Sequence, residues 1–156
     1  MLALPIILLS LFLIFFFSIV VWKGFTKKRV LIAFLLATGC SLVFAGISHI
    51  FVPDIVANNI GWDVCPEFQY EIGIANILIG ILLIFSFYFD NQWILAGIVA
   101  STIWGWGNAL GHIISYKKTK NKKSGNVGWA LYLDIFLPLI SIILYLITYV
   151  YNLIIN

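Results

Sequence analysis

The chain of 156 residues is 63% hydrophobic and only 10% charged, and its mean hydropathy is +1.09. A water-soluble domain of this length has too little interior to bury so much apolar surface, so the composition indicates a polytopic membrane protein. The net charge of +3 comes from two clusters, Lys23–Arg29 and Lys117–Lys123, which flank apolar segments. Since no basic face of a soluble domain is left, nucleic acid is not an expected partner.

Five apolar segments are long enough to cross the hydrocarbon core of a bilayer, which takes about 20 helical residues. In chain order they are Leu2–Trp22, Val30–Phe51, Phe68–Tyr88, Trp93–Tyr116 and Trp129–Tyr151. Between the second and the third, residues 53–70 mix acids and amides with apolar side chains, which predicts a short interfacial helix and a turn at Cys65–Pro66. We therefore expect an all-α protein with five transmembrane helices, forming a single integral membrane domain over residues 1–156.

Helical spacing indicates which side chains share a face in each predicted span. Small and polar residues share a face in four spans: Thr38, Ser41, Ala45 and His49; Gln69, Gly73, Asn76 and Gly80; Gly97, Ser101, Trp104, Asn108, Gly111 and His112; Asp134, Pro138, Ser141, Tyr145, Thr148 and Asn152. Such faces pack against other helices, whereas uniformly apolar faces meet lipid. Spans two to five, residues 30–156, are therefore predicted to form a four-helix bundle. The first span and the basic turn after it, residues 1–29, should be peripheral.

The most distinctive stretch is Trp104–His112, late in the fourth span. It places Asn108 and His112 four residues apart, on one helical face. Gly107 and Gly111 are expected to let another helix approach that face closely. A face of this kind is not typical of lipid-exposed surface.

Alternation of the spans brings six polar residues to one side of the membrane: His49, Glu71, Asn76, Asn108, His112 and Asp134. We predict that they line a polar pocket at that end of the bundle. Glu71 lies away from the face of Gln69 and Asn76, so it should meet another neighbour or the interface. The compartment stays open, because with five spans the two basic clusters lie on opposite sides and the positive-inside rule cannot favour both. The expected location is the cell membrane, with multiple passes and the lipid bilayer as the first partner.

Several short motifs resemble those of an uncharacterised family of small prokaryotic membrane proteins, itself related to the DoxX-like four-helix membrane proteins. These motifs are Gly46-Ile47-Ser48-His49, Phe51-Val52-Pro53-Asp54, Ile60-Gly61-Trp62, Pro66–Asn76 and Gly107–His112. The resemblance covers about Val30 to Tyr151 and implies a four-helix core with the first span as an addition. Some DoxX-like members are subunits of quinone-linked oxidoreductases, so the resemblance also permits a redox or quinone-associated role. It supplies no catalytic residue, and Cys40 and Cys65 are not the cysteine pair that disulfide exchange needs.

Each polar residue also has a structural interpretation. Asn108 and His112 can simply hydrogen-bond across the bundle, and Glu71 can pair with Lys117 or Lys118 at the interface. His49 and His112 can ligate a metal with Glu71 or Asp134, but the chain has no HxxxH or HExxH pattern, so we predict no metal site. An acid within a membrane is costly and points to function by default.

Three functions remain open from the sequence. The protein binds or moves a small ligand or a proton at the polar end, with His112 and Asp134 or Glu71 exchanging protons and with Asn76 and Asn108 orienting the ligand. Alternatively, it is a membrane enzyme acting on a lipid, a quinone or another apolar substrate, with His112 as acid or base. In the third case it is a structural or assembly subunit. A second copy of the chain is a candidate partner, and no cofactor can be named.

Overall fold

The computed structural model describes residues 3–150, which form helices and no strand. The elements are α1 (Ala3–Phe15), a π-helical continuation (Phe16–Val21), α2 (Lys27–Phe51), α3 (Pro53–Ile60), α4 (Pro66–Phe85), α5 (Asn91–Thr119), α6 (Ser124–Val127), α7 (Trp129–Tyr145) and a second π-helical segment (Leu146–Val150). The interfacial helix predicted between the second and third spans is α3, and the predicted turn at Cys65–Pro66 immediately precedes α4. The short helix α6, in the basic loop, is not among the predicted elements. Leu2 and Tyr151, two predicted span ends, lie outside the described residues, as does Asn152.

Local sequence signals explain where the helices begin and end. The side chains of Thr26 and Asp90 cap α2 and α5, accepting hydrogen bonds from the backbone N–H of Arg29 and Trp93. Prolines 53 and 66 open α3 and α4, where a missing N–H costs nothing. Gly61 ends α3 with a φ of 82°, a backbone conformation that glycine adopts without strain.

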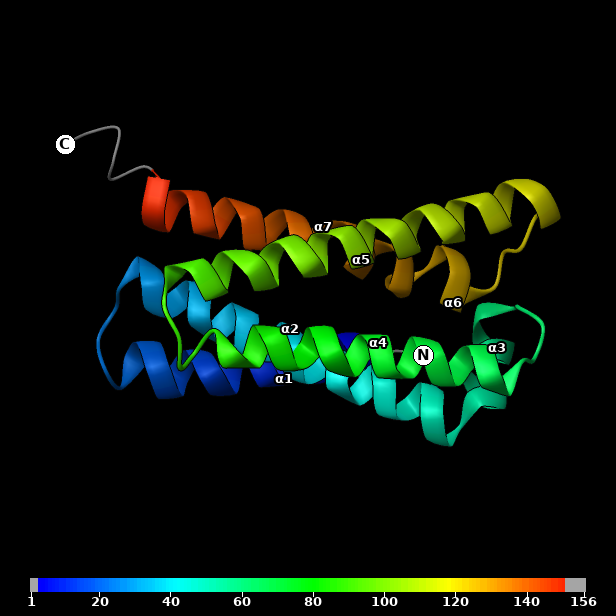
Figure 1. The fold of residues 1–156 in the computed structure, drawn as a ribbon, viewed down its shortest axis with the longest axis horizontal. Coiled ribbons are helices and arrows are strands. Elements are labelled where there is room, and N and C mark those ends of the chain that lie inside the picture. The colour runs from blue at the N-terminus through cyan, green and yellow to red at the C-terminus, as the bar shows by residue number, and fades with distance from the viewer. Residues whose placement is uncertain (1–2, 151–156) are drawn as a thin grey trace.

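Four helices are long and apolar enough to cross a membrane: α2, α4, α5 and the stretch Ser124–Tyr149. Residues Ile6–Val21 form a shorter apolar helix, so a fifth span stays a prediction. Helix α2 packs against α4, α5 packs against α7, and α1 lies along α2. Figure 1 shows α5 and α7 above α1, α2 and α4, with α3 and α6 together at one end. Whether spans two to five close into a bundle within a bilayer stays a prediction as well.

Two glycine pairs set the separation of α2 and α4. A Cβ atom on Gly80 would lie 2.6 Å from the Gly39 carbonyl oxygen, and a Cβ on Gly73 would lie 2.8 Å from the Gly46 carbonyl oxygen. The two contacts are seven residues apart on each helix, so they recur every two turns. Small residues at such positions let helix backbones approach closely where lipid supplies no hydrophobic driving force.

The helices enclose a packed apolar region at the end opposite α3 and α6. Its buried residues come from the start of α2, the end of α4 and the start of α5: Leu31, Ile32, Leu35, Leu36, Leu83, Ile94 and Ile98. Buried polar side chains such as Gln69, His112 and Asn126 lie toward the other end, where α3 and α6 are. The apolar region thus fixes the helices at one end and leaves the opposite end for polar groups.

Candidate functional site

The Trp104-Gly105-Trp106 sequence joins α5 to two neighbouring helices. The indole N–H of Trp104 donates to Asn76 Oδ1 of α4 at 3.0 Å, and that of Trp106 donates to the Ile135 carbonyl of α7 at 3.3 Å. Between them, Gly105 packs on α7: a Cβ there would lie 2.9 Å from the Asp134 carbonyl oxygen. This is the carbonyl that loses its helical donor, because Pro138, four residues later, has no N–H.

The expectation that Gly107 and Gly111 mediate close helix packing is wrong. A Cβ atom built on either glycine has no heavy atom within 4 Å. Both residues instead line a cavity. The reason is rotational, since Gly105 is the glycine on the side of α5 that meets the α7 backbone, whereas Gly107 and Gly111 face open space.

We expect Gly105→Ala to lower the free energy of unfolding by about 2 kcal/mol, because the new methyl group cannot fit against the fixed α7 backbone. Gly107→Ala is the matched control, and it should be neutral or stabilising by up to about 1 kcal/mol, since alanine favours helix. Thermal unfolding of the purified variants in detergent compares the two. Equal losses of stability would show that α5 and α7 do not meet at Gly105.

Asn126 of α6 holds His112 in one orientation. The fully buried Asn126 side chain donates its Nδ2 hydrogens to the carbonyl oxygens of His112 and Asn121, at 3.2 and 3.0 Å. Its Oδ1 therefore faces His112 Nδ1, 2.9 Å away, and acts as an acceptor. It follows that Nδ1 carries a hydrogen, which leaves Nε2 as the ring atom available for other groups.

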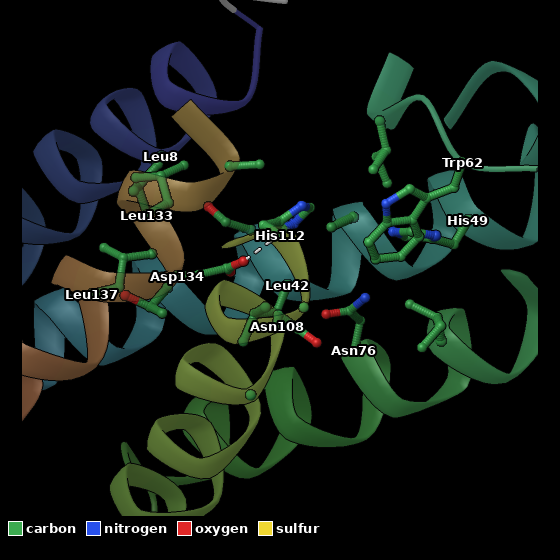
Figure 2. A pocket seen from close by; sticks show the side chains of 18 of the residues that line it. Leu8, Leu42, His49, Trp62, Asn76, Asn108, His112, Leu133, Asp134 and Leu137 are labelled. Atoms are coloured by element: carbon green, nitrogen blue, oxygen red, sulfur yellow. Dashed lines mark ion pairs between the residues drawn. The ribbon is translucent and has the colours of Figure 1, made fainter. Parts of the chain in front are cut away.

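The free Nε2 atom of His112 faces Asp134 of α7. It lies 3.7 Å from Asp134 Oδ2, and the two side chains are 7% and 25% exposed. Figure 2 marks this contact with a dashed line across the cavity, and the two groups carry opposite charges only when His112 is protonated. At 3.7 Å the atoms are too far apart for a direct hydrogen bond, although they are close enough for charges to interact strongly.

Loss of the Asn126 side chain should be costly. Asn126→Ala removes three hydrogen bonds at a buried position, and we expect the free energy of unfolding to fall by about 2–3 kcal/mol. Asn58→Ala, an exposed asparagine whose side chain makes no hydrogen bond to another described residue, is the control and should change stability by less than about 0.5 kcal/mol. Denaturant or thermal unfolding measures both, and an unchanged Asn126→Ala protein would contradict the buried network.

Trp62, in the loop after α3, belongs to the polar end. Its ring stacks on His112 with centroids 5.4 Å apart, and its indole N–H donates to Ser115 Oγ at 3.2 Å. Asn121 fixes the same segment by donating to the carbonyl oxygens of Ile60 and Gly61. The loop after α3 and the loop after α5 are therefore joined over His112.

A cavity of about 230 Å³ lies below these loops. Five of the six predicted site residues line it: His49, Asn76, Asn108, His112 and Asp134. They come from four helices, α2, α4, α5 and α7, and Figure 2 shows them around a common space with Trp62 at one side and Leu8, Leu133 and Leu137 at the other. The sixth residue, Glu71, is exposed and does not line the cavity. It forms no ion pair with Lys117 or Lys118 in the part of the chain that the structure describes.

The polar side chains that line the cavity differ in how many of their hydrogen-bonding atoms already have a partner. His49 Nδ1 lies 2.6 Å from the buried Gln69 Oε1, so its Nε2 stays available. Asn76 uses its oxygen to accept from Trp104 and keeps its amide hydrogens. The side chain of Asn108, which also lines the cavity, makes no hydrogen bond to another described residue. Ser41 also lines the cavity, and its buried hydroxyl lacks a hydrogen-bond partner among residues 3–150.

A second cavity, of about 350 Å³, adjoins the first between the end of α2, α3 and the start of α7. Four residues line both cavities: Ala45, His49, Ile60 and Ala130. Its other lining residues are mainly apolar, among them the exposed Ile55 and Trp129. In residues 3–150, no group of three His, Cys, Asp or Glu side chains is arranged to hold a metal ion.

Sequence reasoning missed the roles of Trp62, Ser41 and Asn126. Trp62 and Asn126 lie between the predicted spans, where periodicity assigns no face, and Ser41 stands among small residues in the stripe of the second span. No curated protein and no solved structure matches the chain. A sequence model described as "Family of unknown function (DUF6790)" matches residues 1–152. Because this match covers nearly the whole chain, the protein belongs to that family of unknown function.

Proposed function

We propose that this membrane protein binds a small molecule, or passes a proton, in the cavity between α2, α4, α5 and α7. The observation that carries the proposal is the His112–Asp134 pair, which lines the same cavity as three incompletely used polar groups, Asn76, Asn108 and Ser41. Ionisable side chains inside a membrane are costly. In a purely structural cluster, neighbouring residues typically satisfy every buried polar group. In this cavity the buried hydroxyl of Ser41 has no hydrogen-bond partner among the described residues.

The residues that line the cavity have different chemical roles in this proposal. His112 is held by Asn126 with Nε2 directed at Asp134, so a proton can be exchanged between the two or with a bound group. The amide hydrogens of Asn76, and both the oxygen and the amide hydrogens of the Asn108 side chain, are available to orient a ligand. Apolar side chains such as Leu133 and Leu137 complete the lining. This mixture of an apolar wall with a few polar groups is typical of small-molecule sites.

Filling the cavity tests the proposal without removing a polar group. Gly111→Leu places a branched side chain in the cavity from a position where a Cβ meets nothing. We expect the variant to fold, to lose small molecules that co-purify with the wild type, and to abolish proton flux if the protein carries one. Native mass spectrometry of the purified protein and a pH-sensitive dye inside proteoliposomes are the measurements.

Ala96→Leu is the matched control, because it adds the same side chain to an exposed position of the same helix. It should retain both the co-purifying molecules and any flux. If the wild type carries no small molecule and no flux, and Gly111→Leu is indistinguishable from it, the polar groups hold the helices together and the protein acts as a structural subunit. Turnover of a candidate substrate in detergent would instead indicate a membrane enzyme.

We also propose the finer architecture that the sequence suggests: five spans, with spans two to five as a DoxX-like four-helix core in the cell membrane. Its support is the pairing of α2 with α4 and α5 with α7, together with the peripheral place of α1. Cysteine labelling with a membrane-impermeant reagent, in intact and in permeabilised cells, tests the number of spans. A fifth crossing would place the N-terminus on the same side as the 120–123 loop, whereas four spans would place it on the opposite side.

A further inference from the structure

Building on the proposed binding function, we infer that the cavity selects a protonated amine attached to an apolar group of about ring size. The starting point is a mismatch in hydrogen bonding. Since Asn126 requires the hydrogen of His112 on Nδ1, the neutral ring presents the lone pair of Nε2 toward Asp134, whose carboxylate oxygens are also acceptors. Two acceptors that face each other need a donor between them.

The distance suits one nitrogen that donates to both. A point about 2.8 Å from each of two atoms exists whenever those atoms are less than about 5.6 Å apart, and charge-assisted N–H donors sit at about 2.7–2.9 Å. His112 Nε2 and Asp134 Oδ2 are 3.7 Å apart. An ammonium group has three hydrogens. Two would satisfy this pair, and Asn108 and Ser41, which line the same cavity, carry oxygens that can accept the third.

The charges around the cavity favour the same class of ligand. Asp134 is the single acidic side chain among the described residues that line it, and no described lysine or arginine lines either cavity. In the covering loops, Lys123 donates instead to the Asn58 carbonyl oxygen at 3.2 Å. A carboxylate or phosphate would therefore enter a site with an acid and without a fixed positive charge, at the cost of its hydration.

The remaining lining defines the apolar part. The rings of Trp62 and Phe68 and the leucines near Asp134 line the cavity, and aromatic rings attract cations as well as apolar groups. A volume of about 230 Å³ exceeds that of a cavity that binds benzene, which is roughly 150 Å³. One ring with an aminomethyl group therefore fits, and the adjoining cavity past His49 offers apolar space for a longer substituent.

The test uses three probes of nearly the same shape and different charge: benzylamine, benzyl alcohol and benzoate, each titrated at neutral pH into the purified protein in detergent. Binding is measured by ligand-detected NMR and by the thermal unfolding midpoint. We expect benzylamine to bind at least about tenfold more tightly than benzyl alcohol, because a charge-assisted hydrogen bond is stronger than a neutral one, and benzoate not to bind.

Asp134→Asn should abolish the preference for the amine while leaving binding of the alcohol within about threefold, since the cavity keeps its shape. Asp90→Asn, the same chemical change at the α5 cap on the opposite end of the molecule, should leave all three affinities unchanged because asparagine caps a helix equally well. Benzoate or benzyl alcohol binding as tightly as the amine overturns the ligand class and leaves the binding site standing. Binding that Gly111→Leu does not abolish, or no binding of any probe, overturns the binding site as well.

Discussion

Gly80→Ala is expected to lower the free energy of unfolding by about 3 kcal/mol, corresponding to a drop of roughly 10 °C in the unfolding midpoint. The added methyl group would lie 2.6 Å from the Gly39 carbonyl oxygen and 2.8 Å from Val43 Cγ2. Backbone atoms of two long helices cannot move aside locally, so α2 and α4 must separate along much of their length. Thermal unfolding in detergent, followed by tryptophan fluorescence, provides the measurement.

A second substitution at the same contact sharpens this prediction. Gly39→Ala alone should cost a similar amount, because its methyl group would lie 2.7 Å from the Gly80 carbonyl oxygen. The double variant should cost clearly less than the two single costs added together, since helices that are already separated have room for the second methyl group. Gly107→Ala is again the neutral control. Fully additive losses would mean that the two glycines do not share one contact.

The second large effect concerns Asp134. We expect Asp134→Leu to lower the free energy of unfolding by about 2 kcal/mol, because His112 Nε2 loses the polar group that faces it. Asp134→Asn should instead remain within about 0.5 kcal/mol of the wild type, since the new amide can donate to the Nε2 lone pair. Denaturant unfolding of the two variants, at the same pH and in the same detergent, distinguishes donation to a neutral ring from attraction between two charges.

A charged His112–Asp134 pair predicts the opposite order of stability for the two Asp134 variants. If His112 is an imidazolium paired with a carboxylate, Asp134→Asn leaves an uncompensated buried charge and should be at least as harmful as Asp134→Leu. In that case the variant His112→Leu with Asp134→Leu should be more stable than either single leucine variant. This result would favour a structural pair and remove the geometric basis for binding an amine.

Helical periodicity alone predicts a large part of the polar end. The stripes on the third and fourth spans identify Gln69, Asn76 and His112, all of which are buried, and the alternation of spans places His49 and Asp134 at the same end. Glu71 shows the limit of that reasoning. It shares the end of the molecule with the other five residues, yet its direction around α4 leaves it exposed.

Periodicity does not distinguish the glycines of α5. Gly105, Gly107 and Gly111 look alike in the sequence, but a Cβ on Gly105 meets the α7 backbone and a Cβ on either of the others meets open space. The rotation of each helix about its axis decides this difference. That rotation depends on how α5 packs against α4 and α7 together, which no single helix encodes.

The sequence by itself determined that the chain is helical, that it is apolar enough for a membrane, and that its polar groups gather at one end. These properties follow from composition and from the repeat of the α-helix, both of which are local. Only the tertiary structure decided that Asn126 orients His112, that Trp62 stacks on its ring, and that Ser41 lines the same cavity. Such contacts join residues from separate helices and loops, so they exist only after the helices have packed.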